Sequence, residues 1–385
     1  MFELNLNPWE NLPEDFENRK TDIMGKSYPL MPREPQTGVT YRVYPDGCTA
    51  GNGAAYHGGV RIGAKKDRLF VYFNGGGLAY DTYSAARPQN LFYDSGDGKE
   101  HYYINDAEWM GDWFLAESLN AAREDNPFRE WSLIHLSYTT GDFHCGDGEI
   151  SYTALDGTQA VLPQHGFHNA MTMIREAKQW VGEPKELVIA GSSGGGFGAS
   201  VLADDIIQEF PGAERISIVI DSSILLADWP AIAKNVWKTP EHLRNRLHSD
   251  NFVADQLEAL YRKYGRRLNY MFISSDRDAL LSEAQSGLDG THMQVDRAKG
   301  DRYTKDLAAM CARLNEEVPG IGLYLFHAPM GDPAFDQYGL TLHCVLDKKE
   351  MFDLKVEGKT ACEWMLDGIE GRTAQLGLEL LDFEG

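Results

Sequence analysis

Cysteine, basic residues and long apolar runs are all scarce in this sequence of 385 residues. The five cysteines (Cys48, Cys145, Cys311, Cys344 and Cys362) form no C-x-x-C pair, which argues against a disulfide framework and against a structural zinc site. No apolar run reaches the roughly 18 residues that a membrane-spanning helix needs. We therefore expect reduced thiols, no metal and no contact with a membrane.

Acidic residues outnumber basic ones. The sequence has 36 lysines and arginines, 58 aspartates and glutamates, and a formal net charge of −22. Such a charge repels nucleic acid and anionic surfaces over a Debye length of about 8–10 Å. The start, MFELNLNPWENLPEDFENRK, lacks the basic and apolar regions of a secretion signal. We expect a cytoplasmic location and a small-molecule or carbohydrate partner, while the oligomeric state stays open.

Strand-like and helix-like patterns alternate from residue 40 onward, after an irregular N-terminal arm at 1–35. The predicted strands are 39–45 and 58–64 (an antiparallel pair), 68–76, 131–142, 186–191, 215–223, 268–276 and 321–329. The predicted helices are 108–122, 167–181, 196–210 and 302–317, with a helical insertion at 224–267. This alternation predicts one α/β domain over 1–385, with a doubly wound, mostly parallel sheet.

The stretch VIAGSSGGGFGAS, residues 188–200, follows a predicted strand and opens a predicted helix. Its Gly191-Ser192-Ser193-Gly194-Gly195 matches G-x-S-x-G, the nucleophile elbow of serine hydrolases. The tight turn would hold Ser193 in a strained conformation above the sheet edge, and the small flanking residues avoid collision. The Gly194 N–H, at the start of the helix, would face a developing oxyanion.

A nucleotide site is the competing interpretation of the same stretch. Gly194-x-Gly196-x-x-Ala199 fits the dinucleotide fingerprint G-x-G-x-x-A, and Asp221 lies at the end of the next strand, where a ribose-binding carboxylate belongs. A phosphate-binding P-loop is excluded because no lysine follows the glycines. This alternative predicts a dinucleotide-dependent oxidoreductase.

Three glycines at the end of an earlier strand favour the hydrolase. A second oxyanion donor comes from such a loop, and VYFNGGGLAYD, residues 71–81, offers Gly75, Gly76 and Gly77, whose amides could approach a substrate carbonyl closely. The dinucleotide interpretation leaves them unexplained. A turn or bulge without a catalytic role is the plain structural alternative.

An acid and then a histidine should follow the elbow along the chain. Asp276 and Asp278 both follow the strand 268–276, and either could orient an imidazole or simply cap the next helix. His327 lies at the end of the last predicted strand, whereas His343 follows it by a loop, from which an imidazole can reach a serine on a central strand. The sequence thus favours His343 as the base.

A polar cluster lies at 138–147, where Asp142, His144, Cys145 and Asp147 follow a strand. Their spacing matches no zinc arrangement. We expect a loop that lines the substrate site, with no metal and no cofactor.

Taken together, these segments resemble the pectin acetylesterase family, which includes the Notum carboxylesterases. FNGGGLAYD looks like the family's oxyanion glycines, NPFREWSLIHLSYTTGDFHCGD (126–147) is similar to its strand-and-loop segment, and LVIAGSSGGGFGAS resembles its serine elbow. SSDRDALLSE and LTLHCV are weaker matches to its acid and histidine loops. The resemblance spans about residues 65–350.

The resemblance implies an α/β-hydrolase fold and a serine carboxylesterase that needs no cofactor. Ser193 would attack an ester, His343 would transfer the proton and Asp278, preferred over Asp276, would hold the imidazole. The amides of Gly76, Gly77 and Gly194 would form the oxyanion hole. The expected substrate is an acyl ester, acetyl-like, on a carbohydrate or small alcohol.

The chain also departs from the family pattern. Leu78 and Ala79 stand where the family has a Trp-Cys pair, and the five cysteines do not reproduce the disulfides of secreted members. We expect the 224–267 insertion, with Trp229 and Trp237, to build a different acyl or alcohol pocket. The mechanism therefore carries over better than the substrate.

Overall fold

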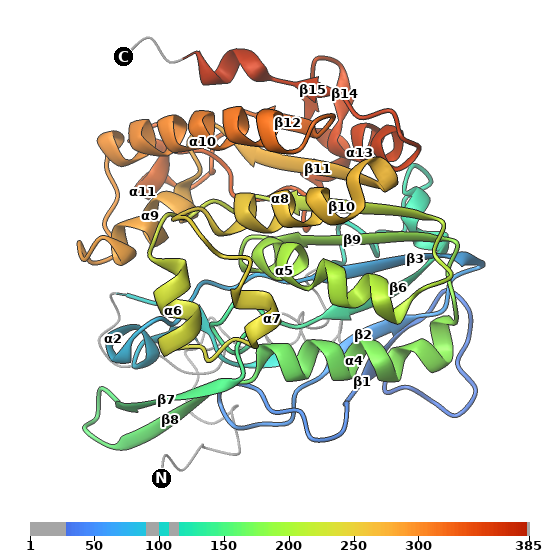
Figure 1. The fold of residues 1–385 in the computed structure, drawn as a ribbon, viewed down its shortest axis with the longest axis horizontal. Coiled ribbons are helices and arrows are strands. Elements are labelled where there is room, and N and C mark those ends of the chain that lie inside the picture. The colour runs from blue at the N-terminus through green and yellow to red at the C-terminus, as the bar shows by residue number, and fades with distance from the viewer. Residues whose placement is uncertain (1–27, 90–99, 108–114, 383–385) are drawn as a thin grey trace.

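The computed structural model describes residues 28–89, 100–107 and 115–382 (Figure 1). Within these ranges, nine strands form one sheet. In sheet order the strands are β1 (Thr40–Val43), β2 (Gly58–Arg61), β6 (Trp131–Leu136), β3 (Lys65–Phe73), β9 (Glu186–Ser192), β10 (Arg215–Asp221), β11 (Leu268–Ser275), β12 (Gly322–Phe326) and β15 (Gln375–Leu376). The pairs β1–β2 and β2–β6 are antiparallel, and all pairs from β6–β3 to β12–β15 are parallel.

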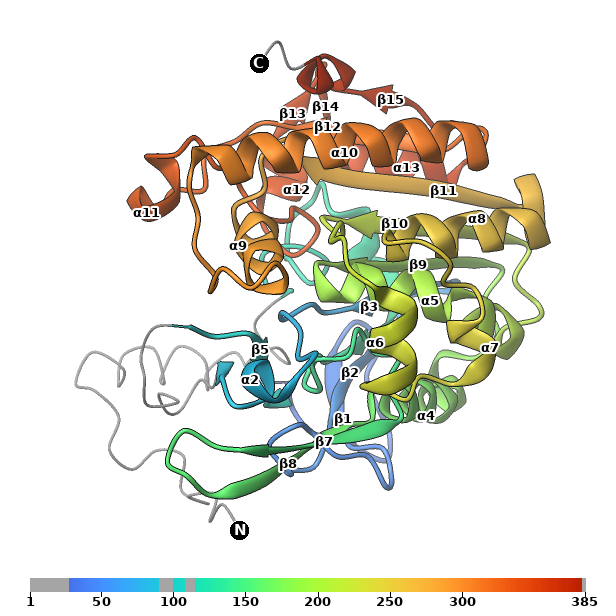
Figure 2. The ribbon, with the colours of Figure 1, turned by 60° about the vertical axis from the view of Figure 1, so that its left-hand side comes forward.

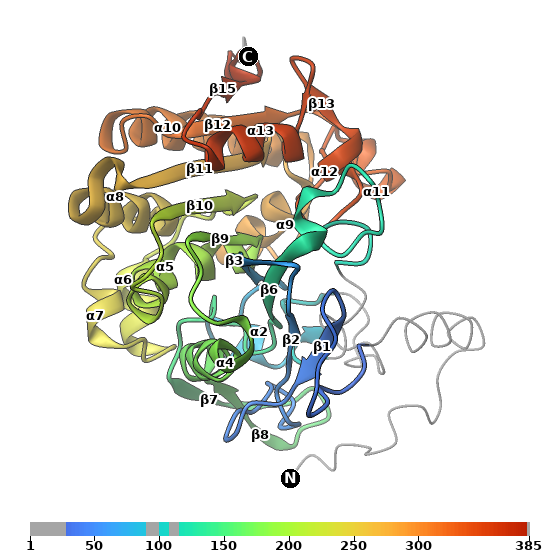
Figure 3. The ribbon, with the colours of Figure 1, turned by 90° about the vertical axis from the view of Figure 1, so that its right-hand side faces the viewer.

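Helices cover both faces of this sheet, which Figure 3 shows nearly edge-on. One face packs against the long helices α4 (Gly166–Val181), α5 (Gly194–Glu209), α8 (Phe252–Tyr264) and α10 (Arg297–Glu317). The other face packs against α12 (Glu350–Asp353), α13 (Ala361–Ile369) and the segment 115–131 with η1 (Pro127–Glu130). Because the central strands are buried on both faces, they are continuous apolar runs rather than alternating ones. The predicted α/β-hydrolase-type fold is thus confirmed.

The remaining elements are short or lie outside the main sheet. They are α2 (Thr82–Ala85), β4 (Pro88–Gln89), β5 (Tyr103–Ile104), β7 (Gly148–Thr153), β8 (Gln159–Gln164), α6 (Trp229–Asn235), α7 (Glu241–Arg244), η2 (Gly265–Arg267), α9 (Ala279–Leu288), α11 (Pro333–Asp336), β13 (Lys355–Val356), β14 (Lys359–Thr360) and η3 (Leu378–Leu381). The strands β7 and β8 pair in an antiparallel hairpin near α2 (Figure 2). The sequence patterns did not predict this hairpin.

Two predicted segments fall partly outside the described residues. Of the predicted arm 1–35, residues 1–27 lie outside, while Leu30 forms a bridge to Arg42 in β1. Of the predicted helix 108–122, residues 108–114 lie outside, and 115–120 form turns instead of a helix. Among the described helices, none combines the length and the apolar character needed to cross a bilayer.

The 224–267 insertion is helical, as predicted, but its tryptophans have a different role. Trp229 and Trp237 are both fully buried, with their rings 5.8 Å apart, and both contact Phe143. Phe197 of α5 stacks on Phe143 at 4.0 Å. Trp229 and Trp237 therefore belong to the core, while the substrate pocket expected from the 224–267 insertion stays a prediction.

Candidate active site

Ser193 occupies a sharp turn between β9 and α5. Its φ of 56° and ψ of −130° lie outside the usual regions for a residue with a side chain. Two hydrogen bonds hold this backbone: the Ser193 N–H donates to the Asp221 carbonyl at 2.9 Å, and the Ser223 hydroxyl donates to the Ser193 carbonyl at 2.7 Å. The serine is only half-buried, although both neighbours in the chain are fully buried.

Close backbone contacts explain the glycines around this turn. A Cβ on Gly191 would lie 2.2 Å from the Gly195 carbonyl oxygen, and a Cβ on Gly195 would lie 2.0 Å from the Phe73 carbonyl oxygen. Neither contact leaves room for a methyl group. The turn therefore forms because the sequence supplies glycine two residues before and two residues after Ser193.

The loop after β3 lies directly against the serine turn. A Cβ on Gly75 would be 2.5 Å from Ser193 Cβ, and a Cβ on Gly194 would be 3.5 Å from the Gly76 nitrogen and 3.4 Å from the Gly77 oxygen. The three predicted oxyanion glycines, Gly76, Gly77 and Gly194, are therefore neighbours. Gly77 has a φ of +74°, which glycine adopts without strain.

Backbone pairing leaves the amides of this loop available. In the bridge between Gly77 and Tyr103, Leu78 donates to the Tyr102 carbonyl at 2.7 Å and Ile104 donates to the Gly76 carbonyl at 2.8 Å. Among the described residues, no acceptor is assigned to the N–H groups of Gly76 and Gly77. The first N–H groups of α5, which begins at Gly194, have no partner within the helix either. These donors belong to two neighbouring turns, because a Cβ on Gly194 would lie 3.5 Å from the Gly76 nitrogen.

The loop 138–147 supports the glycine loop from inside the protein. The Tyr138 hydroxyl donates to the Gly77 carbonyl at 2.9 Å and accepts from the Phe143 N–H at 3.0 Å. His144 donates from Nε2 to the Asn74 carbonyl at 2.8 Å, and its burial lowers its pKa to about 4. A neutral imidazole is therefore built into the framework.

Asp142 shapes the same loop, because its carboxylate accepts hydrogen bonds from the N–H groups of His144 and Gly166 and from the Thr140 hydroxyl. Burial raises the pKa of Asp142. Residues 138–146 are all buried, and only Asp147 of the predicted cluster is exposed. The prediction that this loop lines the substrate site is therefore wrong; the loop is a structural support.

Asp278 and His343 form a buried pair at the same sheet edge. The imidazole Nδ1 lies 2.9 Å and 2.8 Å from the two carboxylate oxygens, and the exposed fractions are 0% for Asp278 and 7% for His343. Thr341 holds the two segments together, because its N–H donates to the Arg277 carbonyl and its carbonyl accepts from the Ala279 N–H, both at 3.0 Å. Asp278 also caps α9 by accepting from the Leu281 N–H at 2.9 Å.

A second pair, Asp276 with His327, lies at the ends of β11 and β12. Here Nδ1 is 3.0 Å and 2.9 Å from the carboxylate oxygens, but the His327 side chain is 56% exposed. The two candidate acids and the two candidate histidines of the sequence analysis thus form two separate pairs. Each aspartate has its own histidine, and burial distinguishes the pairs.

Asp221 has a role that the sequence did not indicate. Its side chain is fully buried, and one carboxylate oxygen accepts from the N–H groups of Val345 and Leu346, both at 2.9 Å. Burial raises the pKa of this carboxyl group. A Cβ on Gly196 would lie 2.0 Å from Ser223 Oγ, so this glycine serves close packing. The dinucleotide alternative therefore has no available carboxylate at Asp221.

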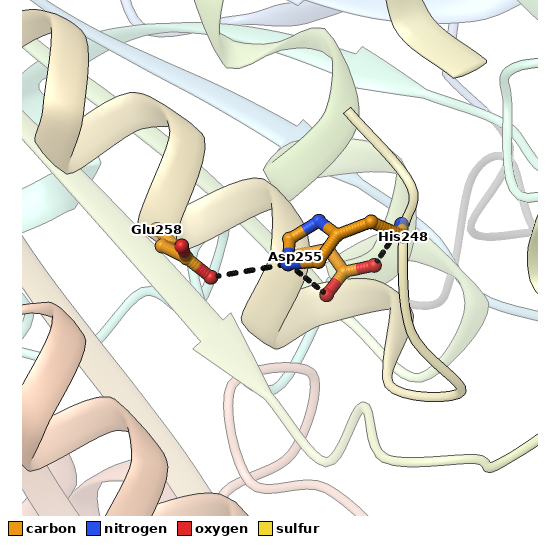
Figure 4. Close-up of side chains that lie close together, drawn as sticks. All are labelled: His248, Asp255 and Glu258. Carbon is orange, nitrogen blue, oxygen red and sulfur yellow. Dashed lines mark hydrogen bonds and ion pairs between the residues drawn. The ribbon is translucent and has the colours of Figure 1, made fainter. Parts of the chain in front are cut away.

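One acidic cluster outside this edge has the spacing of a metal site. The ligand atoms of His248, Asp255 and Glu258 lie within 4.8 Å of one another (Figure 4). However, an Arg313 nitrogen lies 2.7 Å from an Asp255 oxygen and 2.9 Å from a Glu258 oxygen. The guanidinium supplies the positive charge here and ties α8 to α10.

The sequence was also compared with models of protein families. A family model described as Pectinacetylesterase matches residues 44–245, more than half of the chain. The matched region includes the glycine loop and Ser193, whereas Asp278 and His343 lie beyond it. A comparison with curated proteins gave no match.

Proposed function

The chain belongs to the pectinacetylesterase family of carboxylic ester hydrolases, and from this premise we propose that it cleaves an ester through an acyl-enzyme on Ser193. The proposed substrate carries an acetyl-like acyl group on a carbohydrate or small alcohol. A net charge of −22 disfavours a polyanionic substrate such as de-esterified pectin. A neutral ester fits the charge better.

The first half of the proposed reaction forms the acyl-enzyme. Ser193 Oγ attacks the ester carbonyl carbon while the free Nε2 of His343 takes the hydroxyl proton. The proton then passes from His343 to the departing alcohol as its C–O bond breaks. Asp278, which accepts from Nδ1, holds the ring and stabilises its protonated form.

The second half repeats these steps with water. His343 takes a proton from water, the resulting hydroxide attacks the acyl carbon, and the proton returns to Ser193 Oγ as the carboxylic acid leaves. In both halves the carbonyl oxygen becomes negative. The amides of Gly76, Gly77 and Gly194 would stabilise it, and one such donor is typically worth about 3–4 kcal/mol of transition-state stabilisation.

One observation carries the proposal: a half-buried serine with φ of 56° follows one central strand, and a buried Asp–His pair follows the strands two and three positions along the sheet. The loops after β9 and after β12 are joined through residues 221–223. The Ser193 N–H donates to the Asp221 carbonyl and the Cys344 N–H donates to Ser222 Oγ. The serine and the histidine loop therefore contact the same short segment.

A fluorophosphonate probe tests the nucleophile directly. Intact-mass analysis should find one adduct on the wild-type protein and none on Ser193→Ala. Ser200→Ala is the matched control, because Ser200 lies in the same helix with its hydroxyl donating to the Phe197 carbonyl at 2.7 Å. Equal labelling of all three proteins would exclude Ser193.

A panel of p-nitrophenyl esters from acetate to long chains, together with acetylated sugars, tests the substrate. We expect the highest kcat/KM with acetate and no turnover by Ser193→Ala. A steady rise in kcat/KM with chain length would contradict the acetyl-like part of the proposal. Turnover by Ser193→Ala at the wild-type rate would contradict the mechanism.

A further inference from the structure

Both halves of the proposed catalytic machinery are attached to one buried residue, Asp221, at the end of β10. Its backbone carbonyl accepts from the Ser193 N–H at 2.9 Å. One of its carboxylate oxygens accepts from the Val345 and Leu346 N–H groups, two and three residues after His343. Asp221 is therefore bonded to the serine turn and to the histidine loop at once.

Side-chain hydroxyls extend this connection on each side. Toward the serine, Ser192 Oγ donates to the same carboxylate oxygen at 3.0 Å and accepts from the Tyr72 hydroxyl at 2.7 Å. Toward the histidine, Ser222 Oγ donates to the other carboxylate oxygen at 3.1 Å and accepts from the Cys344 N–H at 3.2 Å. Both oxygens of Asp221 are thus in use.

The histidine loop requires such an anchor. Cys344, directly after His343, has a φ of 61°, and Ser222 has a φ of 50°. Non-glycine residues hold these conformations only when their surroundings fix them. The N–H groups of residues 344–346 all point at the Asp221–Ser222 segment, so removing the carboxylate would release the backbone that sets the His343 position.

We propose that Asp221 is a positioning residue, whose buried carboxylate fixes the loop of His343 against the turn of Ser193. The inference rests on the proposed function, since it assigns Asp221 to the same site. Asp221 touches no reacting atom in this scheme. It acts through the distance between the base and the nucleophile, and a displacement of about 1 Å can lower a rate on the order of 100-fold.

Paired substitutions at Asp221 and Asp255 test this role. Asp255 is equally buried and also anchors a loop, because its carboxylate accepts from the His248 and Ser249 N–H groups at 2.7 Å and 2.8 Å, but it lies outside the site. We expect Asp221→Asn, which keeps an acceptor oxygen, to lower kcat about tenfold and Asp221→Ala to lower it about 100-fold. KM should stay within about twofold in both, because substrate contacts are unchanged.

The control variants Asp255→Asn and Asp255→Ala should lose thermal stability to a similar extent while kcat stays within about twofold of wild type. The inference is overturned if both Asp221 variants keep the wild-type kcat, or if the Asp255 variants lose kcat by the same factors. Where Asp221→Ala fails to fold, the comparison of Asp221→Asn with Asp255→Asn decides alone. If Ser193→Ala hydrolyses esters like wild type, the proposed function fails; if Ser193→Ala is inactive and the Asp221 variants are not impaired, only the positioning role fails.

Discussion

Two Asp–His pairs lie at the same sheet edge and have nearly identical hydrogen bonds. Nδ1 lies 2.8–3.0 Å from the carboxylate oxygens in both. Their surroundings differ, because the side chains of Asp278 and His343 are 0% and 9% exposed while those of Asp276 and His327 are 10% and 56% exposed. Hydrogen-bond geometry alone would not separate a catalytic pair from an exposed surface pair.

Burial and attachment make the difference. His343 follows Thr341, which is paired with the backbone of Arg277 and Ala279, and precedes the three residues held by Asp221 and Ser222. Solvent competes for the exposed His327 pair, and such pairs contribute about 0–1 kcal/mol. A general base must lie within hydrogen-bond reach of the proton that it takes, so the fixed position of its loop favours His343.

Replacing each histidine by alanine is the strongest way to break this comparison. We expect His343→Ala to lower kcat about a million-fold, since loss of the base in a serine hydrolase removes nearly all of the triad's contribution. His327→Ala should stay within about twofold. Ester turnover of the two purified variants checks this, and an inactive His327→Ala with an active His343→Ala would reverse the assignment.

Substitution of Asp278 should likewise lower kcat more than substitution of Asp276, but by a smaller factor than the histidine substitutions. We expect Asp278→Asn to lower kcat about 10,000-fold, because an amide favours the wrong tautomer of the imidazole. Asp276→Asn should lower it less than about threefold. Equal losses in the two variants, measured under the same conditions, would show that the two pairs act together.

Stability sharpens the comparison, because Asp278 caps α9 as well as binding His343. Asparagine is a good cap and alanine is not, so Asp278→Ala should be less stable than Asp278→Asn by about 1 kcal/mol. The N-cap of α9 is Asp278 and not Asp276. We therefore expect Asp276→Ala and Asp276→Asn to have almost the same free energy of unfolding. Urea unfolding followed by circular dichroism measures the difference in free energy of unfolding between the alanine and asparagine variants at each position. A larger difference at position 276 than at position 278 would contradict the capping assignment.

The smallest expected effect concerns the exposed pair. His327→Ala should change the free energy of unfolding by less than about 0.5 kcal/mol, and added salt should reduce the change further. The measurement is urea unfolding at low and high ionic strength. A loss above about 2 kcal/mol would mean that this pair is a structural element despite its exposure.

The regular secondary structure of this fold was largely predictable from the sequence. The strands 186–191 and 215–223 and the helix 167–181 appear as β9, β10 and α4, because long apolar runs and helical periodicity are local signals. The hairpin of β7 and β8 was missed, although the Asp156-Gly157 turn between its strands is a local hairpin signal. Of the helix predicted at 108–122, residues 115–120 lie within the described part of the chain and form turns.

The candidate site was predictable only in part, for a physical reason. The elbow at Ser193 is encoded locally by glycine spacing, and Asp278 pairs with His343 as the resemblance implied. The anchor role of Asp221 depends on contacts with residues more than 120 positions away. The same limit applies to Trp229 and His144, whose burial follows from tertiary packing that no short pattern contains.

The contacts of backbone against backbone around the serine turn also limit how this protein could be altered. At Gly75, Gly191 and Gly195 even one added carbon would meet main-chain atoms at 2.0–2.5 Å. In a mutant library aimed at new ester preferences, substitutions at these three positions would therefore disrupt the serine turn instead of changing the substrate range. Variation in substrate range has to arise in segments that approach the serine without forming its turn.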